Sequence, residues 1–265
     1  MRILANTNSC ATISDKTPWS IHNMIEMVLD CYLDVENIVP SNMLVRLQKL
    51  EKLYITCCPV EKVFEVEALE GTNSNELQYV VVEIPNLREV ELRYLQDLKY
   101  IWKNNPWTVL EFPNFTKLSI NDCLSMEHVF TSSMVGSLLQ LQELDISKCR
   151  RMEVIVKEAK VVVEEEGEGE CDDDKVDEII MLPQLKSLKL KHLPSLKGFY
   201  LGNEAFSCSS LDTLEIISCP TMSVFTKGDL ATPELRLIDT SLGRFELVRE
   251  EDLNSFITTK TSTCM

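Results

Sequence analysis

The sequence predicts a solenoid of the α/β class, in which short parallel β-strands stack side by side along one face. Three observations lead to this prediction: a fixed spacing of apolar residues, its recurrence along the chain, and a slot within it that takes cysteine or leucine. In residues 115–130 the apolar positions are separated by 3, 2, 3, 3 and 3, which neither a lone helix nor a lone strand produces. The same spacing returns in segments that begin at Leu87, Leu141, Leu185 and Leu211.

This spacing is that of a leucine-rich repeat, whose unit is one short strand followed by a return segment. In the two-residue step from Leu118 to Ile120, both apolar side chains point to one face and Ser119 points to the other. One such strand buries too little apolar surface to offset an ordering entropy of roughly 1–2 kcal/mol per residue. Stacked copies share a continuous core. We therefore expect a horseshoe with strands on its concave face and irregular or short helical segments on its convex face.

The slot that follows each strand indicates packing rather than metal binding. Cys58, Cys123, Cys149 and Cys219 share this position with leucines in two sister repeats. A slot that accepts leucine needs an apolar group, and free cysteine is among the most frequently buried residue types. The chain has no C-x-x-C motif, and its histidines have no zinc-like spacing to cysteines. We expect neither a metal site nor a disulfide framework.

The formal charge of −16 is concentrated in one insertion. Residues 164–178 hold ten acidic residues and one lysine, so the rest of the chain is only mildly acidic. The insertion lacks the D-x-[DN]-x-[DN]-G motif of a calcium-binding loop. The negative net charge of the chain disfavours nucleic acid or anionic membranes as partners. No apolar run reaches the roughly 20 residues of a membrane helix, and the first ten residues lack the pattern of a secretory signal. We expect a cytoplasmic protein.

Three segments divide the chain. Residues 1–46 predict an irregular start with a divergent first repeat, in which Met27 and Leu29 take the strand positions; the alternative for residues 21–33 is an amphipathic helix. Residues 47–232 form the predicted solenoid, with an acidic loop inserted at residues 157–179. Residues 233–265 keep only part of the spacing, as expected of a degenerate terminal repeat and tail with one face in water.

Turn signals separate the repeats inside the solenoid. Pro59 follows the strand of residues 53–55, where a residue without an N–H cannot extend the ladder. Ser132 or Ser133 is positioned to cap a short helix that ends near residue 139. In three repeats a proline fixes an extended approach to the strand, at Pro85, Pro113 and Pro183.

The sequence lacks the common catalytic and nucleotide-binding motifs. No G-x-x-x-x-G-K-[ST], G-x-G-x-x-G, G-x-S-x-G or H-E-x-x-H pattern occurs, so we expect no enzymatic activity. The candidate site is the concave face, where outward residues of successive strands form polar columns of mixed sign that suit a protein partner; the alternative is a merely solvated face. Tyrosine and arginine are the expected anchors, since they supply large contact areas with few lost rotamers. The predicted partner-binding residues are Tyr54, Glu91, Arg93, Tyr94, Asn121, Asp145, Lys189, Lys191, His192 and Glu215.

Several repeats resemble a particular family. The stretches are LREVELRYLQDLKYIW, FPNFTKLSINDCLSMEHVF, LLQLQELDISKCRRMEVIV and LPQLKSLKLKHLPSLKGF. They are similar to the C-terminal leucine-rich region of plant coiled-coil, nucleotide-binding, leucine-rich-repeat disease resistance proteins, of the lettuce and sunflower type. The resemblance covers residues 47–245 and implies perception of pathogen effectors and restraint of the receptor's nucleotide switch, inside the cell.

The partners that this resemblance implies are a pathogen effector, a guarded host protein or other domains of the same receptor. The family's ATP/ADP-binding module has no counterpart here, so no cofactor-binding or catalytic residue carries over. Two alternatives remain, a stand-alone adaptor for ubiquitin-ligase substrate selection and an acidic-loop binder of basic proteins. The adaptor needs a helical module ahead of the repeats, for which residues 1–46 are short. Deletion of residues 161–177 tests the second, because basic partners would then be lost.

Overall fold

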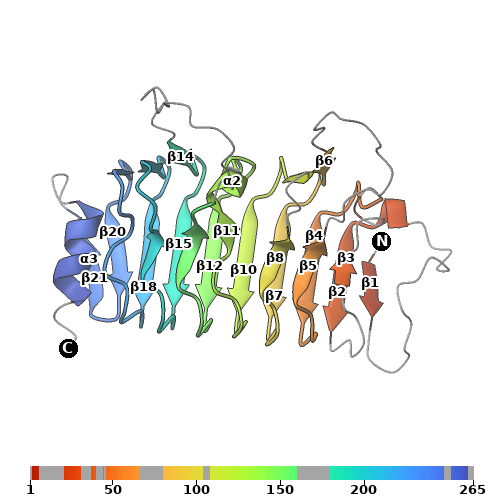
Figure 1. Ribbon diagram of the computed structural model, residues 1–265, viewed down its shortest axis with the longest axis horizontal. Coiled ribbons are helices and arrows are strands. Elements are labelled where there is room, and N and C mark those ends of the chain that lie inside the picture. The colour runs from red at the N-terminus through yellow and green to blue at the C-terminus, as the bar shows by residue number, and fades with distance from the viewer. Residues whose placement is uncertain are drawn as a thin grey trace, which may run out of the picture.

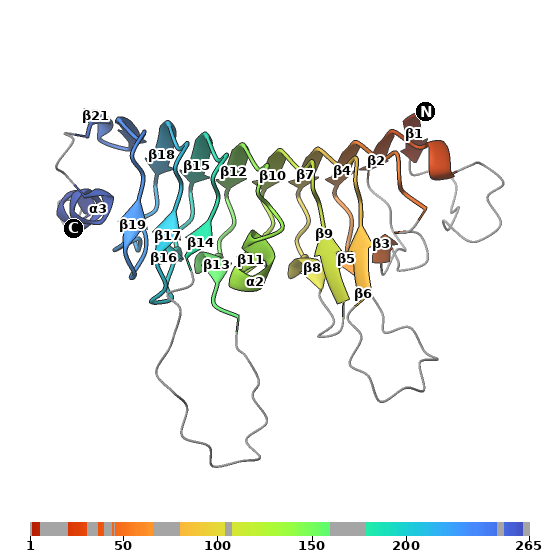
Figure 2. The same ribbon diagram turned by 90° about the horizontal axis from the view of Figure 1, so that it is seen from above.

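The predicted strands build one long sheet. The computed structural model describes residues 2–5, 21–30, 37–39, 44, 46–65, 80–103, 108–159, 179–247 and 252–261, and the acidic run falls outside these ranges. Ten strands form a single gently curved sheet, with neighbours parallel except for the last pair (Figures 1 and 2). In spatial order they are β1 (Arg2–Ala5), β2 (Glu26–Asp30), β4 (Lys52–Thr56), β7 (Glu89–Arg93), β10 (Lys117–Asn121), β12 (Glu143–Ser147), β15 (Ser187–Lys191), β18 (Thr213–Ile217), β20 (Leu237–Thr240) and β21 (Gly243–Glu246).

Residues at the same position of successive repeats lie side by side. Leu118 pairs with Val90 on one side and with Leu144 on the other, and Leu144 pairs with Leu188. These side chains are at most 1% exposed and belong to one hydrophobic cluster that runs from Met24 to Ile257. The prediction of a parallel leucine-rich-repeat solenoid with a shared interior is confirmed. The first repeat contributes a strand, β2, rather than a helix.

The return segments form further short strands on the convex side, opposite the ten-stranded sheet (Figure 2). These convex strands pair in parallel and form four small sheets. Two of the sheets lie in the N-terminal half of the solenoid and two in the C-terminal half. Their strands are β3 (Asn37–Val39), β5 (Lys62–Glu65) and β8 (Tyr100–Lys103); β6 (Val80–Glu83) and β9 (Thr108–Glu111); β11 (Phe130–Thr131), β13 (Val154–Lys157) and β16 (Gly198–Tyr200); and β14 (Ile180–Met181), β17 (Phe206–Ser207) and β19 (Leu230–Ala231).

Helices are few in the described part of the chain. They are the 3-10 helix η1 (Ile21–Asn23), α2 (Ser132–Val135) and α3 (Leu253–Thr261). Helix α2 lies where the sequence placed a helix, but the capping prediction is wrong, because Thr131 and not Ser132 or Ser133 is the N-cap residue and no side chain caps the helix. The helix also stops before residue 139, since Gly136 follows and residues 138–141 form a turn. No helix in the described ranges is long and apolar enough to cross a membrane.

An aromatic stack fills the convex side of the interior between the sheet of β3, β5 and β8 and the sheet of β11, β13 and β16. Trp102 stacks on Phe64 with ring centroids 5.5 Å apart and on Phe130 at 6.2 Å. Its indole N–H donates to the carbonyl of Val129 at 3.2 Å, so the buried polar atom has a partner. This side-chain bond crosses the place where β8 and β11 belong to different sheets.

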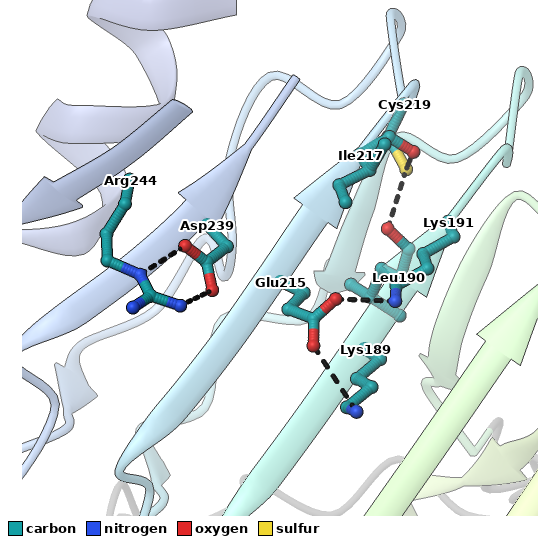
Figure 3. A network of polar contacts seen from close by, with 8 residues as sticks. All are labelled: Lys189, Leu190, Lys191, Glu215, Ile217, Cys219, Asp239 and Arg244. Carbon is teal, nitrogen blue, oxygen red and sulfur yellow. Dashed lines mark hydrogen bonds and ion pairs between the residues drawn. The ribbon is translucent and has the colours of Figure 1, made fainter. Parts of the chain in front are cut away.

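The cysteine slot is buried, as predicted. Cys123 and Cys149 are fully buried, and Cys58 and Cys219 are nearly so. Their thiols donate weakly to backbone carbonyls; Cys219 Sγ lies 3.5 Å from the oxygen of Leu190 (Figure 3). Burial raises the pKa of Cys149 to about 12 and that of Cys219 to about 11. These thiols are protonated at neutral pH and serve as small packing groups.

Each repeat turns away from the sheet through a residue in the left-handed region. A non-glycine residue adopts this conformation at a cost in free energy, so it persists only where the surrounding structure fixes it. In the described chain, five of the six amides extend the ladder by donating to a carbonyl of the neighbouring repeat, as Lys148 N–H does to that of Lys191 at 2.9 Å, whereas Ser218 N–H donates to the Ser241 hydroxyl at 2.8 Å. The non-glycine residues with positive φ are Cys57, Tyr94, Asp122, Lys148, His192 and Ser218.

The C-terminal end of the interior is covered by β21 and α3, at the left of Figure 1. Leu253, Phe256 and Ile257 are buried on the inner side of the helix. Asn254 accepts hydrogen bonds from the amides of Phe225 and Thr226 and donates one back to the Thr226 carbonyl, at 2.7, 3.1 and 3.0 Å. One side-chain amide thus supplies the hydrogen bonds that the strand of a further repeat would make.

Candidate functional site

The outward residues of the concave sheet stand in columns across the strands. Lys117 lies between Glu89 and Glu143, and Ser119 lies between Glu91 and Asp145. Because the pairing keeps the same register from β4 to β18, each column crosses six repeats. The columns predicted from the spacing are therefore confirmed.

A charge network occupies the N-terminal half of the first column. Glu89 accepts ion pairs from Lys52 at 3.4 Å and from Lys117 at 3.9 Å, and Lys117 also reaches Glu143 at 3.4 Å. The Tyr54 hydroxyl donates to Glu89 Oε2 at 3.1 Å. Partial burial, with the bond to Glu89, raises the pKa of Tyr54. The hydroxyl of Tyr54 is thus tied to Glu89 while its side chain stays partly exposed.

A second cluster lies further along the sheet, and we call it the Glu215 cluster. Glu215 on β18 faces Lys189 and Lys191 on β15, with N–O distances of 3.3 and 2.5 Å (Figure 3). Burial acts to raise the pKa of Glu215, but the hydrogen bonds from Lys191 and Lys189 outweigh it and the pKa is lowered. Arg244 binds both carboxylate oxygens of Asp239 nearby, at 2.7 and 2.9 Å. The fork-to-carboxylate geometry fixes both side chains.

Four other predicted residues lie between or beside these clusters, namely Glu91, Arg93, Asn121 and Asp145. Arg93 forms an ion pair with Glu91 two positions earlier on β7. Asn121 donates to the Ser147 hydroxyl at 2.6 Å. Asp145 is half-buried, and burial raises its pKa despite the opposing charges of Lys191 and Lys189. A carboxylate whose charge is disfavoured in this way is a group that a partner's donor could satisfy.

Tyr94 and His192 lie at the edge of the sheet rather than on its face. Both have φ of 55° and directly follow a strand, so they belong to the row of left-handed turn residues. Both are exposed, Tyr94 by 45%. Of the ten predicted residues, eight therefore lie on the concave face and these two lie on its rim.

The structure also adds residues that the sequence analysis had not selected. Glu89 and Lys117 form the centre of the N-terminal network, and Lys52 and Glu143 extend it. The sequence pattern could have identified these four residues, because lysine and glutamate alternate at this strand position across four successive repeats. Within the described ranges, no group of three or more His, Cys, Asp or Glu is placed to hold a metal ion. The arrangement can bind a polar surface through many charged and hydrogen-bonding groups.

Comparison with known proteins agrees with this architecture. The model of a family described as "Plant disease resistance protein RPS2-like, leucine-rich repeats" matches residues 1–150. The chain belongs to this family. The RPS2-like repeats thus include β1 to β12, and with them the N-terminal charge network and the anchors Tyr54 and Arg93.

A curated protein that is also described as a disease resistance protein matches part of the chain. The RPS2-like chain is 28% identical over 139 residues to a probable disease resistance protein of Arabidopsis thaliana. The match covers 52% of this chain and 14% of the Arabidopsis protein. This chain is therefore a leucine-rich-repeat region of the disease resistance type, and it corresponds to a small part of that relative.

Proposed function

We propose that this solenoid recognises a protein through its concave face as part of an intracellular plant immune receptor. The single observation that carries the proposal is the organised concave surface, where tyrosine, arginine and charges of both signs stand in fixed columns. Membership of the disease resistance family supports the proposal that the solenoid is part of a plant immune receptor.

The partner that we propose is a pathogen effector, a guarded host protein or another domain of the same receptor. In the last case, binding would restrain the receptor's nucleotide switch. The chain itself acts without catalysis and without a cofactor, by presenting a surface. We place this activity in the cytoplasm, where effectors delivered into the cell meet such receptors.

The chemistry of the face favours a protein over a polyanion. Glu91, Asp145 and Glu215 alternate with Arg93, Lys189 and Lys191 along the sheet. A nucleic acid or an anionic membrane would be repelled by half of these groups. A protein with complementary charges would bind in one preferred orientation, because other orientations would bring like charges together.

Proximity labelling in leaf cells tests the proposal. The chain, fused to a biotin ligase, is compared with the concave variant Tyr54→Ala, Arg93→Glu, Lys189→Glu. A matched convex variant, Tyr100→Ala, Lys157→Glu, Lys227→Glu, also removes one tyrosine and makes the same change in net charge, at exposed residues away from the concave sheet. We expect at least one protein to be labelled by the wild type and the convex variant and lost with the concave variant.

Titration of the purified candidate then measures the effect. We expect the concave variant to bind at least about tenfold more weakly, since loss of interface anchors of this kind costs more than about 1 kcal/mol each. Circular dichroism and thermal melting confirm that both variants fold. Identical labelling by the concave variant and the wild type would overturn the proposal.

A further inference from the structure

The charges on the concave face largely satisfy one another. In the described chain, all six cations there have an acidic partner on the same or a neighbouring strand. A partner that binds them must compete with these ion pairs. The cations of the face are Lys52, Arg93, Lys117, Lys189, Lys191 and Arg244.

The rim of the sheet, where the concave strands end, differs from the concave face in how its cations are paired. Where β10, β12, β15 and β18 end, the turn residues enclose a groove of about 420 Å³, which we call the edge groove. Lys148 and Arg150 form its basic wall, with His192 beside them and Asp122 at one end. Both cations are exposed, and neither makes an ion pair with any acidic side chain in the ranges that the structure describes.

The edge groove is held rigidly despite its exposure. Asp122, Lys148 and His192 have φ between 55° and 59°, and each donates its amide to the neighbouring repeat at 2.8–2.9 Å. The two prolines in the lining, Pro194 and Pro220, add apolar surface with fixed backbone. A rigid site loses little conformational entropy when a ligand binds.

We propose that the edge groove binds an extended acidic segment of the protein partner. The lining comes from four successive repeats. Since parallel strands lie about 4.8 Å apart, the groove spans about 15 Å, the length of about five extended residues. Two carboxylates of such a segment would pair with Lys148 and Arg150, the latter in a bidentate manner. Asp122 would disfavour a third carboxylate at its end and so fix the direction of the segment.

The chain's own acidic run joins the solenoid at the opposite edge of the concave sheet from the edge groove. The described residues that flank it are the end of β13 and the start of β14. Strand β14 lies on the edge where the concave strands begin, and the edge groove lies where they end (Figure 1). We assign the groove to a partner, and deletion of residues 161–177 tests the acidic run as the alternative occupant.

This inference rests on the proposed function, but its test is separate. Fluorescence anisotropy measures binding of the fluorescein-labelled peptide Gly-Glu-Ser-Glu-Ser-Ser-Gly to the full chain at low salt, with a peptide carrying Gln for Glu as reference. The test variant is Lys148→Glu, Arg150→Glu. The control is Lys227→Glu, Arg236→Glu, which makes the same change in net charge at exposed sites outside the groove.

We expect the glutamate peptide to bind more tightly than the glutamine peptide. The groove variant should weaken it at least about tenfold and the control less than about threefold, because two charge-assisted contacts are reversed in one case only. Equal binding of the two peptides, or equal loss in both variants, would overturn the inference. Such a failure would leave labelling through the concave face intact and so would not touch the proposed function.

Deletion of residues 161–177 completes the test. If the acidic run occupied the groove, its removal would raise peptide affinity in the wild type and leave the groove variant unchanged, which would contradict the assignment to a partner. We expect instead the same small change in both backgrounds, since only overall charge is altered.

Discussion

The two faces of strand β12 show how this chain separates folding from recognition. Leu144 and Ile146 point inward, are at most 1% exposed, and pair with leucine or isoleucine on both neighbouring strands. Asp145, between them, points outward and pairs with Ser119 and Lys189. The inward positions vary only among apolar residues, whereas each outward position changes chemistry from one repeat to the next. The interior therefore specifies the fold and leaves the concave face free to specify a partner.

The largest expected effect comes from the interior. Leu188→Ala removes a fully buried side chain between Leu144 and Leu214. We expect the free energy of unfolding to fall by about 2–5 kcal/mol, from lost burial and the cavity that remains. Urea unfolding followed by circular dichroism measures it. Lys189→Ala on the same strand should cost less than about 1 kcal/mol; an equal cost would contradict the separation of the two faces.

The second effect concerns the end of the interior. Asn254→Ala removes three hydrogen bonds to the backbone of residues 225 and 226. We expect a loss of about 1–3 kcal/mol in unfolding free energy, because backbone groups lose their partners. Amide hydrogen exchange should show faster exchange at residues 225 and 226 and little change in β7. Uniform change along the chain would show that Asn254 has no local capping role.

A smaller effect is expected on the concave face, with a defined dependence on pH. Glu215→Gln weakens the pairs with Lys189 and Lys191 and should cost about 0.2–1 kcal/mol at pH 7. Because the pKa of Glu215 is lowered by folding, its contribution is present above the ordinary glutamate pKa of about 4.3 and is lost as the pH falls through the lowered value. Unfolding at pH 7 and pH 3 compares the two proteins. A difference that does not shrink between pH 7 and pH 3 would contradict this account.

The smallest effect has the opposite sign. Burial raises the pKa of Asp145, so the folded state binds its proton more tightly and the ionised carboxylate costs stability at neutral pH. Asp145→Asn should therefore stabilise the chain by less than about 1 kcal/mol at pH 7, with no gain once the pH falls below about 4. Thermal melting across this range measures the change. A loss of stability at pH 7 would mean that the attraction of Lys189 and Lys191 outweighs burial.

The interior was predictable from the sequence because a fixed apolar spacing specifies both the strands and their register. Once Leu118, Leu144 and Leu188 are aligned, the outward columns follow without further information. The convex strands were not predictable, because segments such as β11 are two residues long and have no period of their own. The cap formed by Asn254 depends on a single side chain meeting a distant backbone, which no local pattern reveals.

The candidate site was predictable only in part, for a related reason. Tyr94 and His192 follow directly on the strands, and bulky residues rarely adopt the left-handed conformation that places them on the rim. The pairing of Glu215 with both Lys189 and Lys191 depends on the reach of long side chains as well as on register. The edge groove combines turn residues from four repeats, and its rim position follows from those same turns.

The most direct test of the central claim compares two serine variants of β12 that differ only in the face they alter. One carries Glu143→Ser and Asp145→Ser, on the outward face, and the other carries Leu144→Ser and Ile146→Ser, on the inward face. Amide hydrogen exchange is measured in β10, β12 and β15. We predict that the outward variant keeps native protection in all three strands and that the inward variant loses it in all three, because they share one interior. Equal protection in the two variants, or equal loss, would contradict the claim that the inward face alone specifies the fold.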